Sequence, residues 1–195
     1  MLRPVRTTAP TAAVSLDEIK RHANAVDFTD DDELLGILVQ TATDHLDGWT
    51  GVLGRCIVNQ GWRQDFGCWP ACRDLRLPFP DVANIVVKYS DTADAEQTVS
   101  NTLYETLSDA RGAFIRLRDN FDAPALNDQR SDPVRIEFTA GFGAVDAVPS
   151  AIKVAIMMLA AHWYANREAV AIGDSAAPLP MAVDALIAPY RRVGV

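Results

Sequence analysis

The sequence predicts an α+β protein in which helical segments at both ends of the chain enclose a β-rich middle. Before residue 55 and after residue 145, apolar residues recur at helical spacing. Between these segments, short runs of alternating polarity are separated by Gly, Pro, Asp and Asn. The simplest assembly is a small four-helix bundle formed by residues 14–54 and 146–195, with an antiparallel β domain inserted over residues 55–145.

Composition limits the classes of protein that the chain can belong to. It has 195 residues, of which 49% are apolar, so a sizeable core can form. The formal net charge of −8 argues against a protein that wraps nucleic acid, because affinity for phosphate depends on Lys and Arg. No apolar run reaches the roughly 18 residues that a membrane span needs. The N-terminus lacks the apolar segment of a signal peptide, so we expect synthesis in the cytoplasm.

The N-terminal part begins with residues 1–13, which are rich in Thr, Ala and Pro and are expected to form a mobile arm. Ser15 and Glu18 form a capping box, the signature of a helix start. A second helix is expected over residues 30–49. Thr29 is its N-cap candidate, and the acidic residues that follow suit the positive end of the helix dipole.

The middle of the chain contains six short runs that are typical of strands. They are residues 57–66, 75–77, 85–89, 103–107, 114–117 and 134–139. The last run alternates strictly between apolar and polar residues, so one of its faces should be buried and the other exposed. Residues 141–143, Gly-Phe-Gly, are interpreted as a turn, because a phosphate-binding loop would need a third glycine or a lysine.

Helical spacing returns at Pro149, whose fixed φ suits the first turn of a helix. One apolar face of this helix consists of Ile152, Ala155, Ile156, Leu159 and Trp163. Met157 and Met158 belong to the apolar residues that spread around the rest of the helix. A helix that is apolar on nearly all sides is expected to be buried on several of them.

The C-terminus combines a short helix with a basic aromatic tail. The helix is expected over residues 181–188, where Pro189 ends it and directs the chain away from the bundle. Tyr190, Arg191 and Arg192 follow. Tyr and Arg are enriched at binding hot spots, so we expect this tail to contact a partner and its removal to leave the core intact. A disordered tail is the alternative.

The sequence offers no catalytic constellation, and we expect neither enzyme activity nor a cofactor. The histidines His22, His45 and His162 stand alone in helical segments, and no nucleophile–base pair appears. Cys68 and Cys72 have a spacing that zinc sites tolerate, and Cys56 could add a third ligand. Because no histidine lies near them in the sequence, we favour reduced structural cysteines over a metal site.

Several short motifs occur in order along the chain. In the N-terminal part they are Val14–Lys20, Asp30–Leu35 and Trp49–Gly51. In the middle they are residues 77–85, Lys88–Asp91 and Arg135–Gly143, and in the C-terminal part Val148-Pro149 with Ile152-Lys153, Tyr164–Glu168, Leu179-Pro180 and Pro189–Arg191. Through these motifs the chain resembles the phage head–tail connector (portal adaptor) family with an inserted β domain, which occurs in tailed phages, prophages and gene transfer agents. The loop of residues 52–55 is longer than this family's usual form.

The resemblance implies a structural protein of the virion. Such adaptors dock as a ring, typically twelvefold, on the portal protein, and they bridge it to the next tail component, a stopper or tail-completion protein. DNA passes through the channel of the ring, and we expect no sequence-specific binding to it. The resemblance also implies assembly in the host cytoplasm, followed by residence at the head–tail junction, without a cofactor or a membrane.

Two groups of residues are candidates for contacts in this role. The portal-contact candidates are Tyr190, Arg191 and Arg192, and the subunit-interface candidates are Met157, Met158, Arg167 and Glu168. The acidic helix start at residues 30–33 is the next candidate for a portal contact. For residues 164–168, an ordinary helix C-terminus is the alternative. For the whole chain, the alternative is a small non-enzymatic protein-binding or regulatory module.

Overall fold

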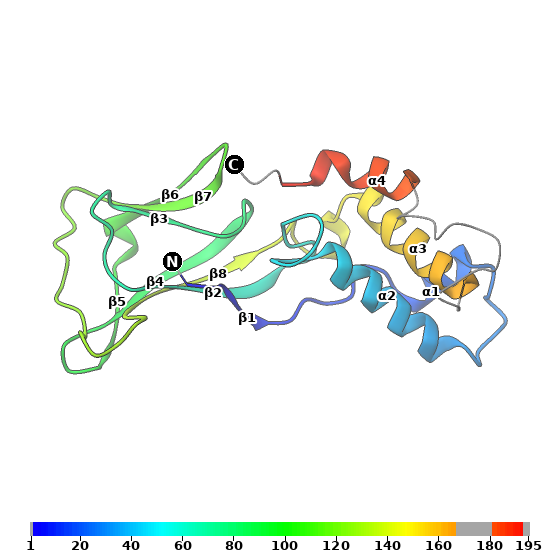
Figure 1. Ribbon diagram of the computed structural model, residues 1–195, viewed down its shortest axis with the longest axis horizontal. Coiled ribbons are helices and arrows are strands. Elements are labelled where there is room, and N and C mark those ends of the chain that lie inside the picture. Colours follow the sequence, from blue (N-terminus) through cyan, green and yellow to red (C-terminus); the bar gives the residue numbers. More distant parts are fainter. Residues whose placement is uncertain (1, 167–180, 193–195) are drawn as a thin grey trace. The chain divides into compact units, whose positions relative to one another are not determined.

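The computed structural model describes residues 2–166 and 181–192, which form two compact units (Figure 1). The β unit consists of residues 2–10 and 59–141, and the helical unit of residues 11–58, 142–166 and 181–192. The described strands are β1 (Val5–Thr8), β2 (Gln60–Phe66), β3 (Asp74–Arg76), β4 (Val82–Ser90), β5 (Glu96–Thr98), β6 (Tyr104–Asp109), β7 (Gly112–Leu117) and β8 (Val134–Ala140). The helices are α1 (Leu16–His22), α2 (Asp32–Leu46), α3 (Ser150–Ala165) and α4 (Met181–Ile187), with 3-10 turns η1 (Asn101–Leu103), η2 (Val145–Ala147) and η3 (Ala188–Tyr190). This mixture of helices and antiparallel sheets confirms the predicted α+β class.

The larger sheet of the β unit has the strand order β1-β2-β8-β4-β5, and its neighbours are antiparallel. Strand β8 lies at its centre and alternates between buried and partly exposed residues, which confirms the two-faced strand predicted from the sequence. Strand β2 pairs with β8 along its whole length, from Gln60↔Ala140 to Phe66↔Val134. One face of this central pair supplies apolar side chains and the buried Gln60 and Gln64 to the core, and the other carries charged ones.

The smaller sheet, β3-β7-β6, covers the same core. Phe79, in the turn between β3 and β4, is fully buried, and its ring centroid lies 4.7 Å from that of Trp62 and 6.4 Å from that of Phe138. The two sheets are also joined by a hydrogen bond in which the Tyr104 hydroxyl donates to the Ile85 carbonyl at 3.0 Å. Tilted aromatic pairs of this kind stabilise a core by more than their buried area alone.

The N-terminal segment forms an edge strand, so the prediction of a mobile arm over residues 1–13 is wrong. The register of β1 against β2 is Val5↔Arg63, Arg6↔Trp62 and Thr8↔Gly61. All four residues of β1 are exposed, because the strand joins the sheet through its backbone groups. A strand without a buried face has no period-2 pattern, and the composition of this segment therefore resembled that of a free arm.

The helical unit is organised around α3, which contacts α1, α2 and α4. Its core includes the fully buried side chains Ile19, Leu35, Leu46, Ile152, Ile156, Leu159, Val183 and Ile187. Helices α1 and α4 contain only seven residues each, whereas α2 and α3 contain 15 and 16. A regular four-helix bundle is therefore not supported, and the arrangement is a pair of long helices flanked by two short ones (Figure 1). In the described part of the chain, no helix is both long and apolar enough to span a membrane.

The ends of the first two helices differ in how well the sequence predicts them. The capping box of α1 is confirmed, since the Ser15 side chain accepts from the Glu18 N–H and Glu18 Oε2 accepts from the Ser15 N–H at 2.7 Å. Helix α2 ends at Leu46, three residues before the predicted end at Trp49. The cause is Asp47, whose buried carboxylate accepts the Ile57 N–H at 2.6 Å and holds the chain in an extended conformation.

Helix α2 offers a matched test of this core. Leu35 is fully buried and Ile37, two residues later, is 56% exposed. We expect Leu35→Ala to lower the free energy of unfolding by about 2–5 kcal/mol, because it leaves a cavity beside α3. Ile37→Ala should change it by less than about 0.5 kcal/mol. Chemical denaturation of both variants measures the difference, and equal effects would contradict the placement of α2 on the core.

Candidate interaction surfaces

The described residues bring together no group of three His, Cys, Asp or Glu side chains that could hold a metal ion. Cys56 is buried in the helical unit, whereas Cys68 and Cys72 are exposed on the β unit. The histidines lie on three different helices, with His22 in α1, His45 in α2 and His162 in α3. The candidate sites in this part of the chain are therefore interaction surfaces. Five surface regions are distinguished by their contacts or by their exposed side chains.

The first region is the C-terminal end of the helical unit. The Tyr190 ring meets the Phe142 ring edge-on, with centroids 6.1 Å apart, and the Arg55 guanidinium lies 4.5 Å above the centre of the Phe142 ring. Arg55 Nη1 also donates to the Tyr190 carbonyl at 3.3 Å. Tyr190 is thus half-buried against its own unit, and the expectation that Pro189 directs a free tail away from the helices is wrong. Because Pro189 falls inside a 3-10 turn, the chain continues along the unit.

The two arginines after Tyr190 differ from it in their surroundings. The backbone N–H of Arg192 donates to the Leu53 carbonyl at 2.8 Å, which ties the segment to the loop after α2. Arg191 is exposed, and its guanidinium lies 3.8 Å from the exposed carboxylate of Asp184. An exposed ion pair at this distance contributes little to stability, so the side chain remains available to a partner. The backbone of this segment is fixed by the Arg192 N–H, and the side chain of Arg191 is exposed.

The second region is α3 itself. None of its side chains from residue 151 to residue 164 is fully exposed. Met157 and Met158 are partly exposed and also pack against the core of the unit. Each of these methionines therefore has one part of its side chain in contact with the core and another part exposed to solvent. Arg167 and Glu168, the other two interface candidates, lie outside the described residues.

The third region is the acidic start of α2. The Lys20 ammonium lies 2.6 Å from Asp32, and the Tyr164 hydroxyl donates to Asp31 Oδ2 at 2.7 Å. These contacts join the start of α2 to α1 and to the end of α3. Asp30 and Glu33 remain exposed. Asp31 contacts Tyr164 near the end of α3, whereas Tyr190 contacts Phe142 before the start of α3, so the acidic end and the basic end at Arg191 lie at opposite ends of the helical unit.

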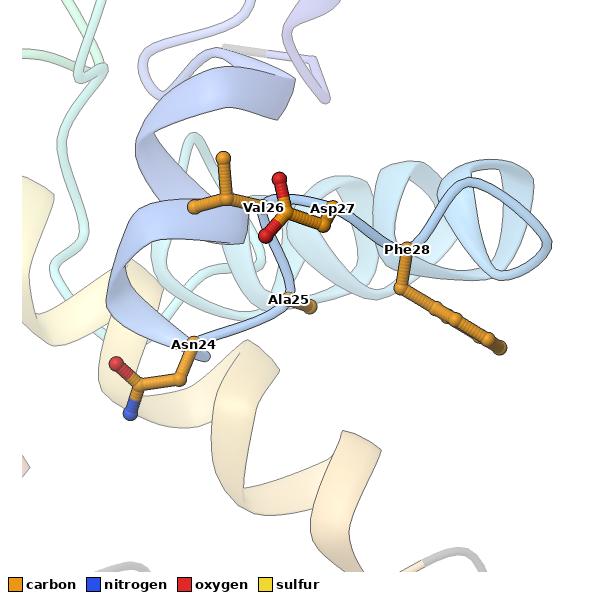
Figure 2. A pocket seen from close by; sticks show the side chains of 5 residues that line it. All are labelled: Asn24, Ala25, Val26, Asp27 and Phe28. Carbon is orange, nitrogen blue, oxygen red and sulfur yellow. The ribbon is translucent and has the colours of Figure 1, made fainter.

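The fourth region is the loop between α1 and α2, which borders an open hollow. Its lining residues are Asn24, Ala25, Val26, Asp27 and Phe28 (Figure 2). Val26 is 57% exposed and Phe28 is 49% exposed. Two large apolar side chains so close together in a loop were not singled out from the sequence, because no periodicity marks them. Their exposure adds an apolar component to the acidic end of the helical unit.

The fifth region is the smaller sheet of the β unit, where two ion pairs surround an aromatic ring. Arg76 is bonded to Asp109 at 2.6 Å, and Arg116 to Asp74 at 2.8 Å. Both guanidiniums lie over the Phe114 ring, 5.0 and 5.3 Å from its centre. The hydrogen bond from Arg76 lowers the pKa of Asp109 to about 2. The hydrogen bond from Arg116 likewise lowers the pKa of Asp74.

Three solved structures with a similar fold come from gene transfer agent particles. The structure titled "Neck of empty GTA particle computed with C6 symmetry" matches with a TM-score of 0.79 and 25% identity, over 100% of this chain and 97% of the other. The virion of the native gene transfer agent particle gives the same values, and the neck of the native particle computed with C12 symmetry gives a TM-score of 0.76.

These similarities support a structural component of the neck of a phage or gene transfer agent particle. They cover both the helical unit and the β unit, because the whole chain is matched. No protein-family model matches the sequence, and no curated protein matches it. The symmetric neck assemblies also support association of the chain with copies of itself and with other particle components.

Tyr190 allows a direct test of the corrected C-terminus. We expect Tyr190→Ala to lower the free energy of unfolding by about 1–3 kcal/mol, because it removes the contact with Phe142 and exposes the core beside it. Tyr190→Phe keeps the ring and should change stability little. Thermal unfolding followed by circular dichroism measures both. A Tyr190→Ala protein that melts at the wild-type temperature would show that the ring does not stabilise the helical unit.

The ion pair of Asp109 predicts a dependence of stability on pH. Because the pKa of Asp109 is lowered from 3.8 to about 2, the pair stabilises the folded state at and above pH 3.8 and loses this effect as the pH falls through about 2. We expect Asp109→Asn to melt at a lower temperature than wild type at pH 5, and the two melting curves to converge near pH 2. A constant difference from pH 5 to pH 2 would exclude Asp109 as its source.

Proposed function

We propose that the chain is the head–tail connector (adaptor) subunit of a phage, prophage or gene transfer agent particle. One observation carries the proposal, namely the match of 100% of the chain to 97% of a chain in the neck of a gene transfer agent particle. A match over both units is informative, because a helical unit interrupted by a β insert is a specific arrangement. The family resemblance of the sequence motifs supports the same role independently of the fold.

In this role the chain forms a ring, and we assign it twelve copies. The neighbouring necks were computed with C6 and C12 symmetry, and both fit a twelvefold ring. Contacts in a ring are heterologous, so each subunit presents two different surfaces to its neighbours. The partly exposed Met157 and Met158 of α3 are candidates for one of these surfaces, and Arg167 and Glu168 are proposed to extend it. Flexible methionine side chains suit a contact that must adapt to a neighbour.

The ring docks on the portal protein through the C-terminal end of the helical unit. Arg191 and Arg192 supply charge-assisted donors for carboxylates or carbonyls of the portal. Tyr190 supports this contact indirectly, because its packing on Phe142 fixes the backbone from which both arginines project. A segment fixed before binding loses little conformational entropy when it docks. The helical unit is thus the docking body, and we assign the contact with the stopper or tail-completion protein to the β unit.

The channel of the ring carries DNA without holding it. The formal net charge of the chain is −8, and an acidic wall gains little from counterion release at phosphates. DNA can therefore slide past the ring during packaging and ejection. We assign the protein no enzymatic activity, and we place its assembly in the host cytoplasm before it joins the particle.

Docking is tested with the portal protein of the same particle. We expect Arg191→Glu combined with Arg192→Glu to weaken portal binding by about tenfold or more, because two charge-assisted contacts become repulsive. Arg118→Glu is the matched control, since Arg118 is exposed on the β unit. Co-sedimentation of each variant with the portal ring measures binding, and thermal unfolding confirms that the variants fold.

Two outcomes would overturn parts of this proposal. Undiminished portal binding by the double variant would move the contact elsewhere, with the acidic start of α2 as the next candidate. If the wild-type chain forms no ring on the portal, as judged by electron microscopy, the adaptor role is wrong. Genes for a portal protein, a protease and a major capsid protein upstream of the coding gene would support the role without any experiment on the protein.

A further inference from the structure

We infer that β1 is an exchangeable strand, which in the assembled ring pairs with β2 of a neighbouring copy of the chain. This inference rests on the proposed ring and identifies one of its subunit contacts. It starts from the position of β1 at the edge of the larger sheet, where β2 is its neighbour. Every residue of Val5–Thr8 is exposed, so the strand contributes almost no side chain to a core.

The contacts that hold this segment would be identical if another copy supplied it. The strand pairs with β2 through backbone groups, and beyond it the Leu2 N–H donates to the Asp65 carbonyl at 3.0 Å. The side-chain amide of Gln64, which is fully buried, donates to the Leu2 carbonyl at 2.6 Å. None of these bonds depends on how β1 is connected to the rest of its own chain. Exchange therefore preserves all of them.

Residues of β2 form the site that accommodates β1. A Cβ atom on Gly61 would lie 2.8 Å from Thr7 Oγ1 and 2.9 Å from Thr8 Oγ1, which is closer than such atoms approach. A side chain at position 61 would therefore force these two threonines to shift. The buried Gln64 amide, on the same strand, adds a side-chain donor directed at the segment before β1. This local fit argues for a specific binding site rather than a passive edge.

The connection of β1 permits the exchange. Residues up to Pro10 belong to the β unit, and the helical unit begins at Thr11. The joining residues Ala9, Thr11 and Ala12 are exposed, so straightening this connection removes little from either core. Pro4 and Pro10 flank the strand and restrict its backbone, which lowers the entropy lost when it binds in a new place. Exchange of an identical element is a low-cost route to subunit contacts, and a ring provides each copy with a neighbour at high effective concentration.

The experiment mixes two full-length chains, each with a single added cysteine, in a Cys68→Ser, Cys72→Ser background. One carries Val5→Cys and the other Arg63→Cys, two positions that are directly paired between β1 and β2. Paired residues on adjacent strands lie about 4.5–5.5 Å apart between Cα atoms, within the range for a disulfide. Since each chain has only one of the two thiols, the Val5→Cys to Arg63→Cys bond forms only between copies.

The control replaces the second chain with one that carries Glu137→Cys, the residue that pairs with Arg63 on the far side of β2. After assembly on the portal and mild oxidation, we expect roughly tenfold more disulfide-linked dimer with Arg63→Cys than with Glu137→Cys. Equal amounts in rings that are visible by electron microscopy would overturn strand exchange and leave the ring intact. The same mixture is also oxidised at high protein concentration without portal. Specific dimers there, together with a failure to form rings on the portal, would support exchange and reject the adaptor role.

Discussion

The structure of the helical unit depends on the burial of α3. This helix has no fully exposed side chain between residues 151 and 164, so it must be covered on several sides. Helices α1 and α2 from the N-terminal part and α4 from the C-terminal part provide that cover. Distant parts of the chain are therefore held in one core, and the β-rich middle has to leave and return at neighbouring points. The hydrogen bond from the Phe142 N–H to the Ile57 carbonyl joins the two points at which it does so. The burial of a single apolar helix thus explains why residues 59–141 leave and re-enter the helical unit at neighbouring points.

The burial of α3 also determines which side chains are exposed at the two ends of the helical unit. At one end, Tyr164 of α3 binds Asp31, and at the other, Phe142 before α3 receives Tyr190 and Arg55. Both clusters consist of polar or aromatic groups that anchor chain segments on the ends of α3. Their exposed neighbours carry the charge, which is acidic near Asp30 and basic at Arg191. The internal contacts therefore orient these surfaces, and the outward charges are left for partners.

The sequence predicted the fold class, the alternating strand β8, the capping box of α1 and the apolar character of α3, because each of these has a local periodic or positional signal. It did not predict β1, which is held by backbone pairing and leaves no trace in the polarity of its side chains. It also misplaced the C-terminal tail, because the partners of Tyr190 are Phe142 and Arg55, which lie far away in the sequence. Pro189 correctly ended α4, but a proline in a 3-10 turn does not decide whether the chain leaves the unit. Patterns of polarity along the sequence do not predict contacts between residues that are far apart in the chain.

Opposite charge at the two ends of one unit has a consequence for the proposed role as an adaptor between two components. A subunit with identical ends would bind either component at either end, whereas an acidic, partly apolar end and a basic end discriminate between them through like-charge repulsion. The exposed Val26 and Phe28 add an apolar component to the acidic end. Because the basic groups are few in a chain of net charge −8, their position matters more than their number. In the proposed docking, Tyr190 fixes the backbone that carries Arg191 and so gives an acidic protein one defined site for an acidic or carbonyl-rich partner.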